Sequence, residues 1–343
     1  MTYQRLKISE IAAAAGVSIP TVSKVLNQRP DVAPTTRERI ERIIAESGYI
    51  HSRTTHSRIE GQTKQTHLID LIAPGALDSE YGLEILRGIE EVLNQSEYRL
   101  ALYSMHDNTP RERHWQSKVT RKTTDGALLF APLDRARHLE KLRSQCIPFV
   151  VIDDILQLEP EIPCVGATNW IGGLTAVEYL LELGHRHIAI ITGIATHITS
   201  RARLAGYRAA LETQGIAIDP SLLRPGDFGH ESGYRETMAL LDRSDPPTAI
   251  FAASDAQAIG VCRALYARNL HVPKDISVIG FDDIPSAARM SPPLTTIRQP
   301  LREMGRMATH MLLRMIAGET LENKRVELAT SLIQRESCAT PGR

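Results

Sequence analysis

Hydrophobic residues in the first fifty positions recur at the spacing of helical faces. This pattern predicts three short helices, whose buried faces are carried in turn by Ile8, Ile11, Ala12 and Ala15, by Val22, Val25 and Leu26, and by Ile40, Ile43 and Ile44. Gly16 stands where the first helix would end in a left-handed turn, and Ser18 is placed to cap the second. The third helix is expected to begin near Pro34 and to end at Gly48.

Two helices joined by the short turn at 15–18 would form a helix-turn-helix, in which the second helix lies in the major groove of DNA. The outward positions near the start of that helix are Ile19, Pro20, Thr21, Ser23 and Lys24. Hydroxyls and a lysine suit hydrogen bonds to phosphates and base edges, and an isoleucine suits a thymine methyl. Periodicity alone equally allows a plain three-helix bundle with a polar surface.

From residue 67 onward, short apolar runs alternate with amphipathic stretches. Strand-like runs lie at 68–72, 99–103, 126–130, 149–152, 188–191, 249–251, 276–279 and 326–334, and helical stretches at 83–95, 172–183, 203–214, 256–268 and 303–317. Such alternation indicates parallel sheets with helices on both faces. The stretch 67–337 is long for one sheet, so we expect two doubly wound lobes with a cleft between them.

Charge separates the two regions. The chain of 343 residues has no net charge, but residues 1–60 hold nine basic and six acidic residues, so they carry +3 and the remainder −3. A basic head on a mildly acidic body points to an anionic partner for the head. The start lacks the apolar region of a secretory signal, and no run approaches the ~18 apolar residues that cross a bilayer. We therefore expect a cytoplasmic protein without membrane contact.

The residues that usually carry catalysis or bind metals show no recognisable pattern. No glycine-rich nucleotide motif, P-loop or nucleophile elbow is present. The four cysteines stand far apart, which indicates reduced thiols. His185 and His187 fall in a predicted helix-to-strand turn, where surface capping is favoured over metal binding. We predict no catalytic residue, no cofactor and no metal ion.

One continuous set of motifs in the head resembles a known family. Ala15-Gly16-Val17-Ser18 and Thr21-Val22-Ser23-Lys24-Val25-Leu26-Asn27, with Gly48-Tyr49 further on, resemble the headpiece of the lac-repressor/galactose-repressor family. The resemblance implies that Ile19, Pro20 and Lys24 read bases. It also implies that Thr21, Ser23 and Asn27 contact the DNA backbone.

The linker at 51–66 departs from that family, whose hinge helix wedges a leucine into the minor groove. Arg58 stands where the family has the leucine, and Thr55 stands where it has an alanine. Ile59, directly after Arg58, is the only apolar candidate for the wedge. Either Ile59 acts as the wedge, or Arg53 and Arg58 bind a narrow minor groove with little bending. A plain flexible linker is the equally open alternative.

The resemblance continues through the body, in segments such as Leu183-Gly184-His185-Arg186-His187 and Gly280-Phe281-Asp282-Asp283. It implies a fold similar to periplasmic sugar-binding proteins, with two lobes joined by crossing strands. The implied effector contacts are Asp153 after a first-lobe strand, Arg203 opening a helix, Asp282 in the second lobe and Phe228 on a sugar ring, with Asp255 and Gln299 as neighbours and Tyr81 as a second stacking face. Each also has an ordinary interpretation, as a turn residue, a surface ion pair or a core aromatic.

These observations predict an α + α/β protein with a helix-turn-helix headpiece at 1–50, a linker at 51–66, an effector and dimerisation domain at 67–337 and a tail at 338–343. The first lobe would comprise about 67–165 and 298–326, and the second about 166–297 and 327–337. We expect a homodimeric repressor of carbohydrate genes that binds double-stranded operator DNA and is released by a sugar. The alternatives are a purine or sugar phosphate as co-repressor, a solute-binding transport protein and an α/β enzyme.

Overall fold

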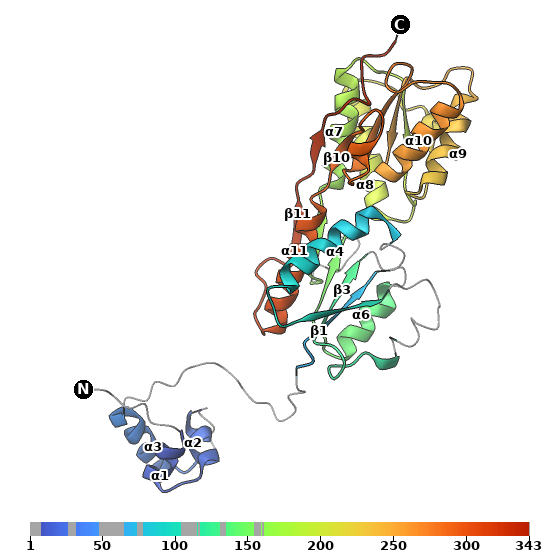
Figure 1. The fold of residues 1–343 in the computed structure, drawn as a ribbon. Coiled ribbons are helices and arrows are strands. Elements are labelled where there is room, and N and C mark those ends of the chain that lie inside the picture. Colours follow the sequence, from blue (N-terminus) through green and yellow to red (C-terminus); the bar gives the residue numbers. More distant parts are fainter. Residues whose placement is uncertain are drawn as a thin grey trace. The chain divides into compact units, whose positions relative to one another are not determined.

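The structure is a computed structural model of the full chain, and it describes residues 8–26, 32–47, 65–73, 78–103, 115, 117–130, 135–153, 159 and 161–342. The chain divides into two compact units, Met1–Gln62 and Thr63–Arg343, and each is described by itself. Figure 1 shows their elements.

The small unit contains the three expected helices, α1 (Ile8–Ala15), α2 (Ile19–Leu26) and α3 (Pro34–Ser47). Its core is made of the residues that the helical periodicity selected, with Val32 from the loop before α3; the buried set is Ile11, Ala12, Ala15, Val22, Val25, Val32 and Ile40. Gly16 has a φ of +62°, so the first helix ends in the left-handed turn that the sequence predicts.

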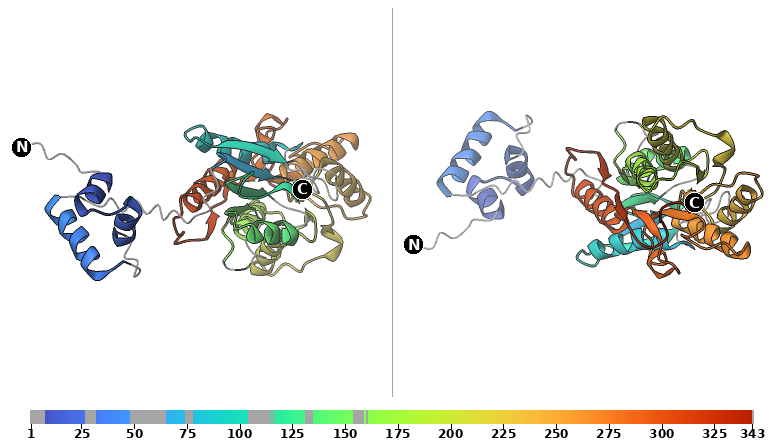
Figure 2. Two further views of the ribbon diagram at one scale, coloured as in Figure 1. Left: turned by 90° about the horizontal axis from the view of Figure 1, so that it is seen from below. Right: turned by 90° about the horizontal axis from the view of Figure 1, so that it is seen from above.

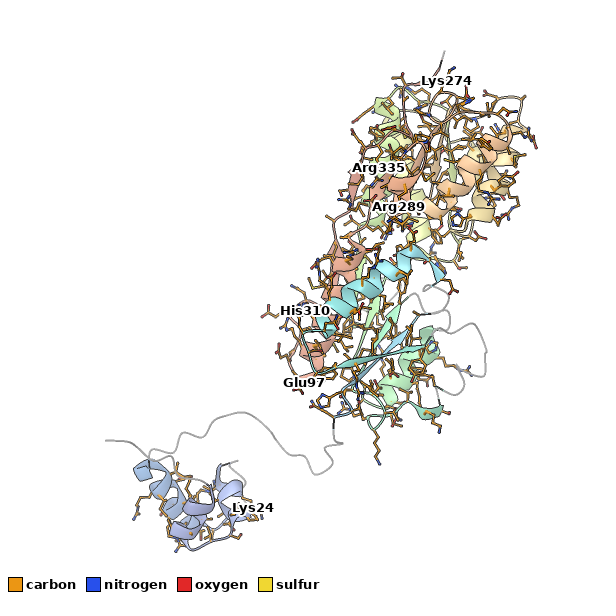
Figure 3. The ribbon with its side chains drawn as sticks, viewed as in Figure 1. Lys24, Glu97, Lys274, Arg289, His310 and Arg335 are labelled. Atoms are coloured by element: carbon orange, nitrogen blue, oxygen red, sulfur yellow. The ribbon has the colours of Figure 1, made fainter. Side chains whose placement is uncertain are left out.

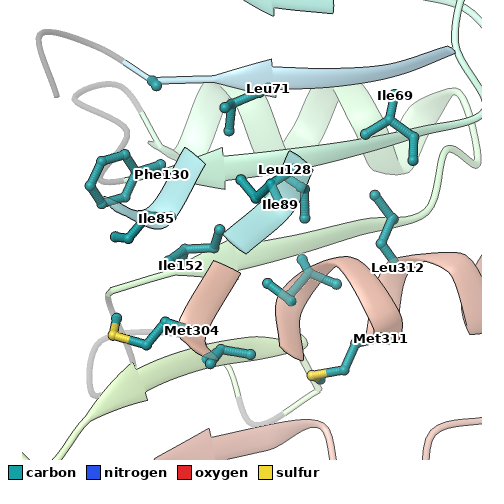
Figure 4. Close-up of a cluster of buried hydrophobic side chains, with 14 of the residues drawn as sticks. Ile69, Leu71, Ile85, Ile89, Leu128, Phe130, Ile152, Met304, Met311 and Leu312 are labelled. Atoms are coloured by element: carbon teal, nitrogen blue, oxygen red, sulfur yellow. The ribbon is translucent and has the colours of Figure 1, made fainter. Parts of the chain in front are cut away.

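The first lobe of the large unit is a parallel six-stranded sheet in the order β11-β5-β4-β3-β1-β2. Its strands are β1 (Leu68–Ile72), β2 (Arg99–Tyr103), β3 (Gly126–Phe130), β4 (Phe149–Ile152), β5 (Cys164–Ala167) and β11 (Arg325–Leu328). Helices α4 (Glu80–Leu93) and α11 (Leu301–Ile316) pack on one face, and α6 (Arg135–Ser144) on the other. Figure 4 shows the core under α4 and α11, where Ile85 and Ile89 meet Met304 and Leu312.

The second lobe repeats the arrangement, with the strand order β12-β10-β9-β8-β6-β7. Its strands are β6 (Ile188–Ile191), β7 (Leu223–Arg224), β8 (Ala249–Ala252), β9 (Ser277–Asp282), β10 (Thr295–Arg298) and β12 (Ser331–Ile333), of which β12 is antiparallel to β10. Helices α7 (Asn169–Glu182) and α8 (Ile198–Thr213) cover one face, and α9 (His230–Leu241) and α10 (Asp255–Ala267) the other. Figure 2 shows helices on both sides of the sheets.

The chain passes between the lobes three times, after β5, after β10 and after β11. The exits from the first lobe, expected at about 165 and 326, lie close to the ends of β5 and β11, which continue to Ala167 and Leu328. Two of the crossing segments are held together side by side: the Thr168 and Thr330 hydroxyl oxygens are 3.0 Å apart, and the Thr330 amide donates to the Thr168 hydroxyl at 2.9 Å.

His185 corrects another expectation. It is not a surface capping residue but is 1% exposed, with hydrogen bonds to Thr248 Oγ1 at 2.9 Å and Ser277 Oγ at 3.0 Å. Burial lowers the pKa of its imidazole. Its Nε2 also meets the Ala339 carbonyl at 2.9 Å, so the predicted tail packs on the second lobe instead of leaving it.

Candidate functional site

Two acidic residues stand at the carboxyl ends of central strands, one in each lobe. Asp153 follows β4, and Asp282 is the last residue of β9. Both have a positive φ, 69° for Asp153 and 118° for Asp282, and Phe228 has a φ of 69°. Non-glycine residues rarely adopt this conformation, and such strained positions concentrate at functional sites.

Arg203 lies at the centre of a group of second-lobe residues, and we call Arg203, Asp282 and Gln299 the second-lobe wall. Arg203 lies within α8 instead of opening it, as the sequence had suggested, because the helix begins five residues earlier at Ile198. The side chain is 3% exposed, its Nε donates to Asn169 Oδ1 at 2.8 Å and its Nη1 donates to the Ala253 carbonyl. The guanidinium stacks 3.8 Å from the Phe281 ring centroid and lies 3.6 Å from Asp282 Oδ1.

Two glycines let α7 and α8 approach closely enough for this arrangement. A Cβ at Gly173 would lie 2.4 Å from the Arg203 carbonyl oxygen, and one at Gly206 would lie 2.3 Å from the Trp170 carbonyl oxygen. Any side chain at either position would push the two helices apart. The backbone that carries Arg203 and Trp170 is therefore fixed by direct helix contact.

Asp282 completes the second-lobe wall with Gln299. Gln299 Nε2 donates to Asp282 Oδ1 at 2.7 Å, while Gln299 Oε1 is buried without a hydrogen-bond partner among the described residues. Burial raises the pKa of Asp282 to about 7, although the nearby Arg203 charge acts in the opposite direction. This wall therefore holds one arginine, one carboxyl group and one amide in fixed positions.

The first-lobe wall is formed by Tyr81 and Asp153. The Tyr81 ring stacks on Phe130 with 5.7 Å between the ring centroids. The ring was expected to stack on the ligand, but this contact makes its hydroxyl group the part of Tyr81 that we consider for ligand binding. Burial raises the pKa of Tyr81 well above its usual range, with the charges of Asp153 and Asp282 adding to the effect. The pKa of Asp153 is also raised by burial. Neither the Tyr81 hydroxyl nor Asp153 Oδ1 makes a hydrogen bond of normal geometry among the residues that the structure describes, although the Tyr81 hydroxyl lies near enough to the Asp153 carboxyl to lower its pKa and so partly offsets the effect of burial.

Phe228 and Asp255 occupy different places relative to these walls. Phe228 is half-buried, and the Arg203 guanidinium carbon lies 5.5 Å from its ring centroid. Asp255 is wholly buried behind the wall: Thr296 Oγ1 donates to one carboxylate oxygen at 2.5 Å and the Ile284 amide to the other at 2.9 Å. With both oxygens occupied, Asp255 braces the loop after β9 instead of facing the cleft.

A pocket of about 250 Å³ adjoins Asp153 and is lined by residues that the sequence did not select as site residues. Its lining includes Asn169, Trp170 and Ile171 from α7 and Thr199 from α8. Trp170 is 43% exposed, unusual for so large an apolar side chain. A signal was available, since Trp170 is one of only two tryptophans and closely follows the carboxyl end of β5.

The exposed face of α2 carries several of the predicted DNA-contacting residues. Ile19 is 47% exposed, Pro20 is exposed and Thr21 is half-buried. Lys24 is also exposed and is labelled in Figure 3. The predicted residues Asn27, Arg53, Arg58 and Ile59, and the side chain of Ser23, lie outside the described residues.

The described residues include neither a helix that could span a membrane nor a cluster that could hold a metal ion. No helix there is both long and apolar enough to cross a membrane. Within the same part of the chain, no group of three or more histidine, cysteine or acidic residues could hold a metal ion.

Comparison with known proteins identifies both regions. Residues 7–52 match the family described as bacterial regulatory proteins, lacI family, and residues 177–338 match a periplasmic binding protein-like domain. The ribose operon repressor of Escherichia coli is 34% identical over 331 residues, which cover 96% of this chain and 99% of the repressor. The purine repressor PurR of Erwinia tasmaniensis is 36% identical over 335 residues, covering 97% of this chain and 96% of its own.

Solved structures agree. The transcriptional regulator CelR in complex with cellobiose has a TM-score of 0.75 and 31% identity, covering 97% of this chain and all of that one. The lac repressor dimer bound to operator and an anti-inducer has a TM-score of 0.69 and 28% identity, covering 98% of this chain and 100% of its own. The sequence identity, the coverage and the two-region architecture lead to one conclusion: the chain belongs to the lacI family of bacterial regulatory proteins.

Proposed function

We propose that this transcriptional regulator is a homodimeric repressor whose cleft binds a sugar through Tyr81, Asp153, Arg203, Asp282 and Gln299, and that the bound sugar lowers its affinity for operator DNA. Dimerisation would place two α2 helices in successive major grooves of a near-palindromic operator. The ribose, cellobiose and lac relatives support this proposal by their names and bound ligands.

The observation that carries the proposal is the set of unpaired polar atoms between the two walls. The Tyr81 hydroxyl, Asp153 Oδ1 and Gln299 Oε1 are buried beside the Arg203–Asp282 pair without hydrogen-bond partners among the described residues. Buried polar groups of this kind normally find partners. A ring with several hydroxyls can donate to a carboxylate and accept from a guanidinium at once, and its C–H face can cover the Phe228 ring.

A purine or a sugar phosphate is the second candidate, because PurR is among the similar relatives. The cleft opposes a phosphate, because its two carboxyl groups, Asp153 and Asp282, outnumber the single arginine and repel an anion in their ionised forms. The N–H groups of a purine base can donate to carboxyl groups as well, but the base has no hydroxyl that donates to a carboxylate and accepts from a guanidinium at once. The geometry therefore favours the sugar.

Release of DNA follows as a shift between open and closed forms. A ligand that contacts both walls stabilises whichever form brings Tyr81 and Asp153 close to Arg203 and Asp282. The shift is limited by how much more tightly the ligand binds that form. One contact already joins the lobes, because the Ser286 amide donates to Glu80 Oε2 at 2.8 Å.

The test combines ligand and DNA binding. Thermal unfolding of the full chain would be followed with a panel of monosaccharides, disaccharides, sugar phosphates and purine bases, since a ligand stabilises the fold in proportion to ln(1 + [L]/Kd). We expect a neutral sugar to raise the Tm and to weaken binding to an operator selected from random duplex DNA. A Tm rise with a purine or a phosphate, and none with neutral sugars, would exclude the sugar proposal.

The headpiece has its own test. A fragment spanning residues 63–343 is expected to keep ligand binding and to lose operator binding. Lys24→Ala in the full chain should weaken operator binding by about 1–3 kcal/mol if the lysine contacts a base. Specific operator binding by the 63–343 fragment would show that α2 is not the recognition helix.

A further inference from the structure

The pocket beside Asp153 extends the cleft toward the place where the chain crosses between lobes. It is lined by the end of β5, the first turns of α7 and α8, and Glu327 of β11. Arg203, Phe228 and Asp282 are not among its lining residues. Asp153 and Asn169 both line the pocket, and Asn169 accepts a hydrogen bond from Arg203 at 2.8 Å, so the pocket adjoins the cluster around Arg203.

The side chains of the second pocket are those that proteins use to hold a ring with hydroxyl groups. Trp170 and Ile171 are 43% and 45% exposed, so they present apolar surface at the pocket instead of burying it. Glu327 is exposed, and Thr199 adds a hydroxyl. An aromatic face next to carboxylates covers the C–H side of a sugar ring and accepts hydrogen bonds from its hydroxyls.

Backbone donors complete the set. Helices α7 and α8 both begin at the pocket, and neither N-cap residue, Thr168 or His197, caps its helix with a side-chain hydrogen bond. Uncapped N–H groups at a helix start seek an acceptor. The pocket thus combines backbone donors with the acceptors Asp153 and Glu327. A hydroxyl group satisfies both kinds, whereas an anion would be repelled by the two carboxylates.

We propose that this pocket is a second sugar subsite, with Trp170 as the stacking residue, and that the effector is a disaccharide or longer oligosaccharide rather than a monosaccharide. The inference rests on the proposed sugar-binding function and specifies its ligand class. One ring occupies the cluster around Arg203 and the next ring lies against Trp170, with Asp153 contacting both. Specificity for chain length then resides in Trp170 and Glu327.

The location of this subsite also couples it to movement of the lobes. Thr168 lines the pocket and is hydrogen-bonded to Thr330 on the neighbouring crossing segment. A ring bound there lies beside Thr168 of one crossing segment and beside Glu327, which is in β11 just before the other crossing segment begins. The second ring would therefore bind next to the segments that join the two lobes.

The experiment compares glucose with cellobiose, galactose with lactose, and xylose with xylobiose by calorimetry on the full chain. For the pair that binds, the disaccharide should bind at least tenfold more tightly than its monosaccharide. Trp170→Ala should remove roughly tenfold of that advantage and leave monosaccharide affinity unchanged, because stacking on an aromatic ring is worth about one factor of ten. Trp170→Phe should restore part of it.

A matched control and a second readout keep the test interpretable. Tyr266 is 84% exposed on α10 and does not line the pocket, so Tyr266→Ala should change neither affinity. Trp115 is 2% exposed, so quenching of tryptophan fluorescence by iodide reports on Trp170, and bound disaccharide should protect it where the monosaccharide does not.

The outcomes separate the two proposals. Equal affinities for monosaccharide and disaccharide, with Trp170→Ala silent, would overturn the subsite and leave the sugar-binding cleft standing. If no sugar of the panel binds the folded wild-type chain while a purine or phosphate does, the proposed function itself fails and the subsite with it.

Discussion

The two walls of the cleft are built in different ways. On the second lobe, Arg203 is held by Asn169, by the Ala253 carbonyl and by the Phe281 ring, and Asp282 is held by Gln299. On the first lobe, the Tyr81 hydroxyl and Asp153 Oδ1 are buried without hydrogen-bond partners among the described residues.

This difference assigns different tasks to the lobes. Pre-formed groups lose little freedom when a ligand arrives, so the second lobe is suited to receive the sugar first. Unpaired buried groups cost free energy until they are satisfied, so the first lobe gains most when the ligand bridges the cleft. The second-lobe wall thus orients the ligand, and the first-lobe wall contributes the free energy that favours closure of the cleft.

The largest expected effect comes from breaking the second-lobe wall. Arg203→Met leaves Asn169 and the Ala253 carbonyl without their donor and removes the positive charge beside Asp282, and should lower the free energy of unfolding by about 3–5 kcal/mol. Arg201→Met, at an exposed position on the same helix, serves as the control and should have little effect. Urea denaturation measures both, and equal stability of the two variants would show that the wall is not a stabilising network.

A pH dependence follows from Asp282. Its pKa in the folded protein is raised by burial from 3.8 to about 7, so the protonated form is favoured by folding. The stability contributed by this group is complete below about pH 4 and is lost as the pH rises toward 7. Asp282→Asn should therefore gain stability relative to wild type across this range. A constant difference between the two proteins from pH 4 to 7 would refute the raised pKa.

The first-lobe wall should behave in the opposite way. Asp153→Asn removes a buried carboxylate with an unpaired oxygen, so the free energy of unfolding without ligand should stay level or rise. Sugar affinity should fall by about 1–3 kcal/mol, because a ligand hydroxyl loses a charged acceptor. Denaturation and calorimetry on the same preparation measure the two quantities. A large loss of stability would erase the contrast between the walls.

Tyr81→Phe is the mildest change. The variant keeps the packing against Phe130 and removes only the hydroxyl, so the free energy of unfolding without ligand should stay level or rise by about 1 kcal/mol. Sugar affinity should decrease by about 1 kcal/mol. If affinity is unchanged, the hydroxyl does not contact the ligand, and Asp153 is then the one residue of the first-lobe wall that does.

Sequence periodicity predicted the elements with strong apolar patterns and missed those without one. The strand β4 reads Phe-Val-Val-Ile and was predicted with its bounds. In contrast, β10 reads Thr-Thr-Ile-Arg, and α6 is so rich in charged residues that neither shows a clear period. Such elements form because they pack against neighbouring strands and the core, and the local sequence pattern does not show those contacts.

The site shows the same limit at the level of single residues. The family resemblance assigned Asp153 and Asp282 to the effector site, and both lie at the carboxyl ends of parallel strands, although the strand before Asp282 was expected to end at residue 279. The sequence did not show that Asp255 is occupied on both oxygens, since its partners Thr296 and Ile284 lie far along the chain. A surface ion pair was the alternative interpretation of Arg203, and its burial, with only 3% of its surface exposed, excludes a surface position.

The late return of the chain to the first lobe has a consequence during protein synthesis. Five strands of that lobe are made by Ala167, but α11, which supplies Met304, Met311 and Leu312 to its core, begins at Leu301. A ribosome adding ~5–20 residues per second needs roughly 7–27 s to cover that interval. Throughout it, the nascent first lobe has one sheet face covered by α4 alone, while β6 to β10 of the second lobe are made in one continuous stretch. The first lobe, although it emerges first, therefore stays without its last helix until most of the chain is made, and during that time it is the part that chaperones have reason to bind.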